Sequence, residues 1–177
     1  MTIVMSNPRQ KGKSGNTKYS ACGDFTNHRS AAVCWYGFGL DVIPVLRGTK
    51  MTAVKWDPWL DNLGLESICN HWDTHPDHEL GFIVGDDMIV FDADSPEAIA
   101  ALAQIEEAFD IIPNLIIQTT KGQHHFFRRA ADTFCKSDSH STEKHPDRID
   151  VKTGRALVVL PPSTGKTVLI GEVFDEE

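Results

Sequence analysis

The feature that most constrains this chain is a short apolar run that ends in two aspartates. Met88-Ile89-Val90-Phe91 lies between the turn-forming segments Gly85-Asp86-Asp87 and Ser95-Pro96, and Asp92-Ala93-Asp94 closes the run. An apolar run of this length between turn signals predicts a buried strand. Residues i and i+2 of a strand face the same side, so we expect the two carboxylates to project together.

Paired carboxylates are costly to bury, and a cation can offset that cost. Two ionised carboxylates repel each other, and an unpaired buried charge is unfavourable. Oxygen ligands of this kind suit Mg²⁺ or Mn²⁺. The alternative interpretation is an ordinary acidic turn from strand to helix, in which Asp94 or Ser95 caps the next helix. The motifs that follow along the chain favour the cation site.

Hydrophobic periodicity predicts strands mixed with a few helices. We expect helices at 27–36, 65–72 and 96–109, strands at 40–46, 81–84, 88–91, 115–119, 124–128, 149–152 and 156–160, and loops at 47–63 and 130–146. The strands at 81–84 and 88–91 are expected to form a hairpin. The pattern predicts an α+β fold, with a mostly antiparallel or mixed sheet and helices packed on one side of it.

The helix at 96–109 carries the clearest amphipathic pattern of the chain. Its apolar positions predict packing on the sheet through Ile99, Leu102, Ile105 and Phe109. The acidic residues of the same helix, Glu97, Glu106 and Glu107, are then expected to be solvated and not catalytic.

Composition indicates one soluble globular domain. The 177 residues suffice for one domain, and no segment approaches the ~20 apolar residues of a membrane span. We expect a flexible basic leader at 1–25, rich in Gly, Ser and Asn, and a single catalytic domain at 26–174. The four cysteines lack paired spacing, which predicts reduced thiols and a cytoplasmic location. They are Cys22, Cys34, Cys69 and Cys135.

Net charge limits how the chain can contact nucleic acid. The formal charge is −8, whereas phosphate backbones favour a basic surface. Any contact with DNA is therefore expected to be local or bridged by metal ions.

Three chemical features follow one another along the chain. After Asp92 and Asp94 comes His124, behind the turn Thr120-Lys121-Gly122-Gln123, and then Asp150 within Arg148-Ile149-Asp150-Val151. A third carboxylate from another strand can complete a metal pair, and a histidine can donate a hydrogen bond to a phosphate oxygen. Metal-assisted phosphoryl transfer needs this equipment, with metals ~3.5–4 Å apart.

The ordered set of motifs resembles a known family. Gly37 to Val45 is like "G-x-x-V-x-P-L", Leu80 to Gly85 like "N-I-G-I-x-T-G", Val90 to Asp94 like "V-L-D-x-D", Thr119 to Phe127 like "T-x-x-G-x-H-x-Y-F", Ile149 to Lys152 like "I-D-V-R", and Leu160 to Ser163 like "A-P-P-S". In this order they resemble the N-terminal domain of bifunctional DNA primase–polymerases (prim-pol), in the archaeo-eukaryotic primase superfamily. One departure is Lys121-Gly122, where the family often has two glycines.

The resemblance implies an RRM-like palm core and a catalytic set. It implies Asp92, Asp94 and Asp150 as ligands of Mg²⁺ or Mn²⁺, and His124 as a contact to the phosphates of the incoming nucleotide. His125 is expected to face the other side of its strand as a half-exposed residue. Lys121 and Lys152 are triphosphate partners or else solvated lysines.

The resemblance also implies an activity, with two alternatives. It implies primer synthesis or extension from nucleoside triphosphates on single-stranded or primed DNA, in phage or plasmid replication. Because no helicase sequence follows, a separate helicase is the expected partner. The alternatives are a weakly active or inactive module that binds nucleotide or DNA and recruits replication proteins, and a metal-dependent nuclease. The net charge favours the binding module, whereas the three aspartates and His124 favour the enzyme.

Two further groups of residues have competing interpretations. Trp56 and Trp59 lie in a lysine-bearing segment and are candidate base-stacking residues, although aromatic side chains more often belong to the core. Cys69, His71, His75 and His78 suggest zinc, but their spacing does not match common structural zinc sites.

Overall fold

The computed structural model describes residues 27–129, 135–139 and 145–171. The expected basic leader at 1–25 lies outside these residues, as does part of the expected loop at 130–146. The elements in chain order are α1 (His28–Gly37), β1 (Val42–Val45), α2 (Trp56–Asp61), α3 (Leu65–Thr74), β2 (Glu79–Val84), β3 (Met88–Ala93), α4 (Pro96–Phe109), β4 (Leu115–Gln118), β5 (Gln123–Arg128), β6 (Asp150–Lys152), β7 (Ala156–Leu160) and β8 (Thr167–Gly171).

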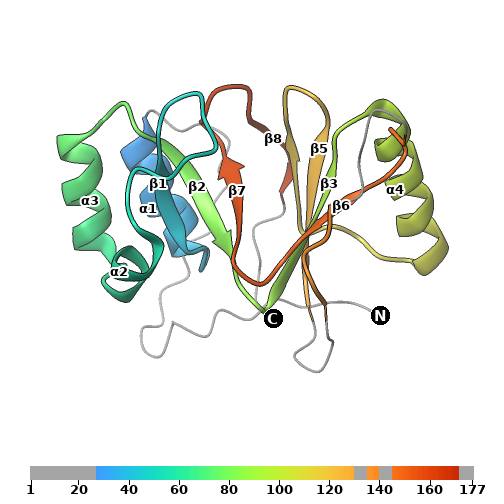
Figure 1. Ribbon diagram of the computed structural model, residues 1–177, viewed down its shortest axis with the longest axis horizontal. Helices are drawn as coiled ribbons and strands as arrows, with labels where there is room; N and C mark the ends of the chain where they lie inside the picture. Colours follow the sequence, from blue (N-terminus) through green and yellow to red (C-terminus); the bar gives the residue numbers. More distant parts are fainter. Residues whose placement is uncertain (1–26, 130–134, 140–144, 172–177) are drawn as a thin grey trace.

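The strands form two antiparallel sheets. The smaller sheet has the order β1-β2-β7 and the larger one the order β6-β3-β5-β4-β8. Figure 1 shows α1, α2 and α3 beyond the smaller sheet, at the left, and α4 beyond the larger sheet, at the right. The α+β class with antiparallel pairing is confirmed, but the expectation of one sheet with helices on one side is wrong.

The hairpin expected from residues 81–84 and 88–91 does not form. The first strand, β2, pairs with β1 and β7, whereas β3 pairs with β5 and β6. All six residues of β2 are buried, and the strand has a partner on each side. No edge of β2 is left for β3, so the chain crosses from one sheet to the other between them.

Two elements were not expected from the sequence. The six residues of α2 are too few to show a helical period, and the segment was expected to be a loop. The strand β8 pairs with the edge strand β4, with a register shift between Ile116 and Ile117. Its consecutive apolar residues do not alternate, so the usual strand pattern is absent.

The core lies mainly between the helices α1 and α3 and the two sheets. Its largest fully buried side chains include Trp72, Phe126 and Ile68. Within the described residues, no helix is long and apolar enough to cross a membrane. The expectation of reduced cysteines is wrong for Cys34, which is disulfide-bonded, whereas Cys69 and Cys135 are free.

Helix α4 begins as the sequence predicts but packs through fewer residues. Ser95 accepts a hydrogen bond from the N–H of Ala98, at 3.0 Å, and caps the helix before Pro96. Leu102 is 1% exposed, but Ile105 is 39% and Phe109 73% exposed, so their expected burial is wrong. One turn further along α4, the helix contacts the sheet through a polar pair, Glu106 with His125 of β5.

Candidate active site

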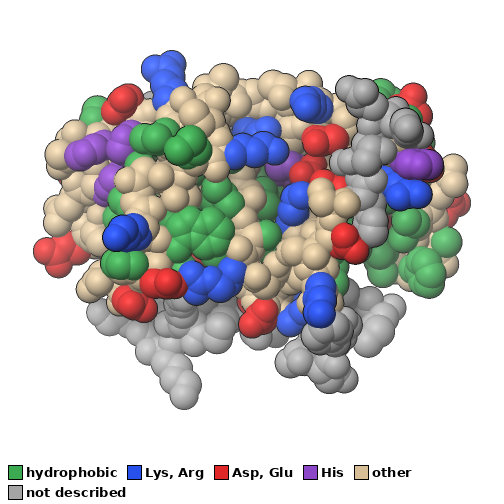
Figure 2. Space-filling view, in the orientation of Figure 1, with side chains coloured by type: hydrophobic (Ala, Val, Ile, Leu, Met, Phe, Trp, Pro, Cys, Tyr) green, Lys and Arg blue, Asp and Glu red, His purple; other side chains and the backbone are tan. Residues whose placement is uncertain are grey.

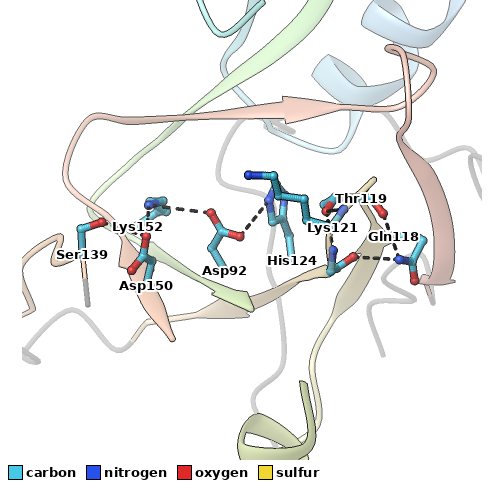
Figure 3. Close-up of polar contacts among 9 residues, drawn as sticks. Asp92, Gln118, Thr119, Lys121, His124, Ser139, Asp150 and Lys152 are labelled. Carbon is cyan, nitrogen blue, oxygen red and sulfur yellow. Dashed lines mark hydrogen bonds and ion pairs between the residues drawn. The ribbon is translucent and has the colours of Figure 1, made fainter. Parts of the chain in front are cut away.

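Three residues of the expected catalytic set lie side by side on neighbouring strands. Asp92 of β3 stands opposite His124 of β5 and, on the other side, opposite Asp150 of β6. Directly opposed residues of antiparallel strands share one face of a sheet. Figure 3 shows their side chains projecting away from α4. They are 5%, 7% and 7% exposed, so this group, the acidic site, is largely withdrawn from water.

A lysine lies between the two carboxylates of the acidic site. The Nζ atom of Lys152 is 3.2 Å from Oδ2 of Asp150 and 3.7 Å from Oδ2 of Asp92. The hydroxyl of Ser139 donates a second hydrogen bond to Oδ2 of Asp150, at 2.8 Å. Lys152 was expected to contact a triphosphate or solvent, but here its ammonium forms ion pairs with both Asp92 and Asp150 (Figure 3).

Two buried polar atoms of the acidic site have no hydrogen-bond partner. Nε2 of His124 is 3.3 Å from Oδ1 of Asp92, within ion-pair distance. The contact does not have hydrogen-bond geometry, and Oδ1 of Asp92 remains unsatisfied, as does Nδ1 of His124. Unsatisfied buried groups are uncommon in folded proteins and mark places where a ligand can supply the missing partner.

The charges around Asp92 keep its carboxyl ionised. Burial acts to raise the pKa of Asp92, but His124, Lys152 and Lys50 lower that pKa below the ordinary value of an aspartate. Asp92 is therefore negative at neutral pH despite its burial.

Asp94 and the turn between β4 and β5 border the acidic site. Asp94 directly follows β3 and is half-buried. In the turn, the hydroxyl of Thr119 accepts hydrogen bonds from the N–H groups of Lys121 and Gly122, at 3.2 and 3.0 Å. A Cβ atom on Gly122 would lie 1.8 Å from the carbonyl oxygen of Ala93, so only glycine permits this close approach. Lys121 is exposed on the turn.

His125 occupies the opposite face of the sheet, as strand alternation predicts. Its Nδ1 atom lies 2.6 Å from the Glu106 carboxylate on α4, and its Nε2 atom 2.9 Å from the side-chain oxygen of Gln123. His125 is 4% exposed, so the expectation of a half-exposed residue is wrong. The expectation that Glu106 is solvated is also wrong, because its side chain is only 15% exposed.

Two lysines that were not among the candidate site residues interact electrostatically with the aspartates of the site. Lys50 lies in the loop after β1, and Lys166 in the loop between β7 and β8. Lys50 lowers the pKa of Asp92. Burial and then the charge of Lys50 lower the pKa of Lys166, while Asp92, Asp94 and Glu79 act to raise that pKa. Figure 2 shows basic, acidic and histidine side chains gathered between β7 and β3.

The candidate stacking tryptophans have structural partners. The indole of Trp59 donates a hydrogen bond to the carbonyl of Val42, at 2.7 Å, and packs edge-on against Trp72. The indole of Trp56 donates to the hydroxyl of Thr52, at 3.1 Å. These contacts give both rings a role in the fold.

The three histidines of the suspected zinc set cluster at the end of α3. Nε2 of His71 is 2.9 Å from Nδ1 of His78, and the rings of His71 and His75 stack with centroids 5.0 Å apart. Burial, followed by the charges of His75 and His78, lowers the pKa of His71 to about 4. The rings of His71 and His78 thus hydrogen-bond to each other.

The acidic site offers donors suited to a hard cation. Its carboxylate oxygens match Mg²⁺ or Mn²⁺, and Oδ1 of Asp92 has no hydrogen-bond partner. However, no three His, Cys, Asp or Glu side chains among the described residues are arranged to hold a metal ion. The donor chemistry fits such a cation, which Asp92 and Asp150 would hold in place of the Lys152 ammonium.

Comparison with known proteins places the chain in one family. No curated protein is similar enough to the chain to count as a relative. Residues 32–170 match the family described as "Bifunctional DNA primase/polymerase, N-terminal". This match covers β3, β5 and β6 and confirms the resemblance drawn from the motifs. The chain belongs to the Prim-Pol family.

Proposed function

We propose that this domain is a metal-dependent nucleotidyltransferase that makes or extends primers on a DNA template from nucleoside triphosphates. Membership of the Prim-Pol family supports a primase or polymerase type of function. The observation that carries the proposal is the strand register, which sets Asp92 opposite both His124 and Asp150. Carboxylates and an imidazole on one buried face are suited to phosphoryl transfer.

Each residue has a definite role in this proposal. Asp92, Asp94 and Asp150 hold Mg²⁺ or Mn²⁺. When bound, such ions lower the pKa of the attacking 3′-hydroxyl and stabilise the leaving pyrophosphate. His124, whose Nδ1 atom has no hydrogen-bond partner, donates to a phosphate oxygen. The five-stranded sheet acts as the palm that carries these groups.

Lysines balance the charge of the triphosphate. Lys50 acts electrostatically on Asp92, Lys166 is under the influence of Asp92 and Asp94, and exposed Lys121 borders the same site. With a cation on the carboxylates, Lys152 would be available to contact the phosphates. Because the net charge is −8, this local group of lysines supplies the basic surface for the nucleotide and for single-stranded or primed DNA.

The wider setting is part of the same proposal. Phage or plasmid replication, in the host cytoplasm and beside a separate helicase, is the setting that the resemblance implies.

A binding module without turnover is the second candidate. It is favoured by Lys152, whose ammonium forms ion pairs with Asp92 and Asp150, the carboxylates that a cation would need. In that case the domain binds nucleotide or DNA and recruits replication partners.

Incubation with a primed template, deoxynucleotides and Mn²⁺ separates these functions. Extension of the primer, lost in Asp92→Asn, supports the polymerase. Degradation of the DNA identifies a nuclease, and a mobility shift without turnover identifies the binding module. Either of the last two results contradicts the proposed activity. A parallel reaction with ribonucleotides and an unprimed template tests primer synthesis.

A further inference from the structure

Glu79 is a buried carboxylate that the acidic site does not include. It is the first residue of β2 and is 3% exposed. Burial acts to raise the pKa of Glu79, but hydrogen bonds from Thr164 and Gly48, together with the charge of His28, lower that pKa overall. Glu79 is therefore ionised at neutral pH, although it is buried in the middle strand of the smaller sheet.

The carboxylate of Glu79 joins two loops that are distant in the sequence. Its Oε2 atom accepts a hydrogen bond from the N–H of Gly48, at 3.0 Å, in the loop after β1. Its Oε1 atom accepts from the N–H of Thr164, at 3.0 Å, and from the hydroxyl of the same residue, in the loop between β7 and β8. Each carboxylate oxygen of Glu79 therefore accepts a hydrogen bond from the backbone of one of the two loops.

Each of these loops carries a lysine two residues beyond its bond to Glu79. Lys50 follows Gly48, and Lys166 follows Thr164. A Cβ atom on Gly165 would lie 2.3 Å from Cγ2 of Thr120, so the loop that carries Lys166 packs against the turn between β4 and β5, beside the acidic site. The charge of Lys50 acts on both Lys166 and Asp92. The two like charges repel each other, so their loops need an anchor to keep both lysines near the acidic site.

The geometry points to Glu79 as a positioning residue. We propose that its carboxylate fixes both loops so that Lys50 and Lys166 together receive the phosphates of a nucleoside triphosphate. This inference rests on the proposed function and identifies how the phosphate-binding half of that site is preorganised. Glu79 itself does not touch the ligand. Because the two loops are already ordered, the lysines bind the phosphates without the entropic cost of ordering these loops.

The substitution Glu79→Gln distinguishes a positioning role from a purely electrostatic one. Glu79→Gln removes a negative charge near an anion-binding group, and Coulomb interaction alone would then strengthen phosphate binding. The positioning role predicts the opposite, because the amide cannot accept from both loops as the carboxylate does. A loss of affinity is therefore a signature of geometry and not of charge.

The experiment is calorimetric binding of inorganic tripolyphosphate, without metal, to the whole chain. We expect Glu79→Gln to weaken binding about tenfold, or ~1.4 kcal/mol. Glu107→Gln is the matched control. It makes the same chemical change at an exposed position on α4, far from the two loops. It should leave the affinity unchanged. Unchanged or tighter binding by Glu79→Gln overturns the proposal, as does a wild type that does not bind tripolyphosphate.

A double-mutant cycle shows whether Glu79 acts through the lysines. In the background Lys50→Gln with Lys166→Gln, the change at Glu79 should no longer weaken binding. The same tenfold weakening there would contradict the proposal. If Glu79→Gln does not fold, Thr164→Val removes one donor to Oε1 and keeps the charge, and it should weaken binding in the same direction.

Primer extension separates this proposal from the proposed function. Where the wild type extends primers, Glu79→Gln should raise KM for the nucleotide far more than it lowers kcat. A wild type that binds tripolyphosphate through the lysines but never extends a primer contradicts the polymerase and leaves the positioning role intact. A wild type that extends primers, with a Glu79→Gln variant of normal KM, contradicts the positioning role alone.

Discussion

The ammonium of Lys152 lies 3.2 Å from the carboxylate of Asp150, so the acidic site contains its own counterion. The same ammonium is 3.7 Å from Asp92. In the proposed function, a divalent cation shared by the two aspartates would compete with this lysine for the same oxygens. The affinity for that cation would then depend partly on the free energy of displacing Lys152.

Lys152→Met should tighten Mn²⁺ binding. Two unit charges ~4 Å apart interact by ~4 kcal/mol near a protein surface, and solvent reduces this because the Lys152 side chain is 24% exposed. We expect affinity to rise about tenfold, or ~1.4 kcal/mol. Titration of Mn²⁺ followed by electron paramagnetic resonance measures the effect. Lys121→Met, on the exposed turn, is the control, and equal affinities of the two variants would show that Lys152 is no competitor.

Gly122→Ala should disrupt the turn beside Asp94. A Cβ atom at this position would lie 1.8 Å from the carbonyl oxygen of Ala93, and backbone atoms cannot move aside cheaply. We expect a loss of at least ~3 kcal/mol in the free energy of unfolding, measured in urea. Gly37→Ala is the control, because a Cβ atom there meets nothing within 4 Å. Equal stability of both variants would mean that the turn does not approach β3 so closely.

The two adjacent histidines should fail in different ways. His125→Ala breaks a buried pair with Glu106 and should cost about 3 kcal/mol of folding stability. Denaturant unfolding tests this, with exposed Glu107→Gln expected to stay within ~0.5 kcal/mol of the wild type. A His125→Ala protein as stable as the wild type would contradict the pairing of β5 with α4.

His124→Ala should instead impair nucleotide use in a protein of near-normal stability. A charge-assisted hydrogen bond to phosphate is worth ~1.5–3 kcal/mol, so its loss predicts a ten- to hundredfold effect on kcat/KM. Steady-state extension of one primed template by both histidine variants, corrected for the folded fraction, is the measurement. A larger corrected loss for His125→Ala would place the wrong histidine in the acidic site.

Acid should destabilise the protein through His71. Its pKa is about 4 in the folded protein against 6.5 for free histidine, so the unfolded chain binds more protons between these values. The stability that His71 contributes is complete above about pH 6.5 and falls as the pH drops toward 4. Between pH 7 and 5, wild type should lose more stability than His71→Gln. Parallel curves for the two proteins would contradict the effect.

The residues of the acidic site could be predicted from the sequence because local signals mark them. An apolar run ending in Asp92-Ala93-Asp94 indicates a strand with carboxylates at its end, and alternation distinguishes His124 from His125. The contact between Lys152 and Asp150 could not be predicted, because it depends on which conformation the flexible lysine side chain adopts.

Long-range pairing is the part that the sequence leaves open. Consecutive strands such as β2 and β3 usually pair, but here each finds partners far along the chain. Lys50 lies in Gly48-Thr49-Lys50, which is part of the family resemblance, but no chemical role follows from that segment. Gly165-Lys166-Thr167 is like the end of a phosphate-binding loop, but the first glycine of that loop is missing. The pairing of β2 with β1 and β7, together with the bonds from Glu79 to Gly48 and Thr164, brings the two lysines' loops together.

The most direct test of the whole account is single-turnover primer extension by Asp92→Asn, Asp150→Asn and the double variant. When two residues act as one catalytic unit, removing either of them already abolishes the contribution of both. The double variant should therefore extend the primer no more slowly than the slower single variant. The account predicts extension by wild type, loss of at least about a thousandfold in each single variant, and no further loss in the double. Extension at near wild-type rate by Asp92→Asn would contradict it.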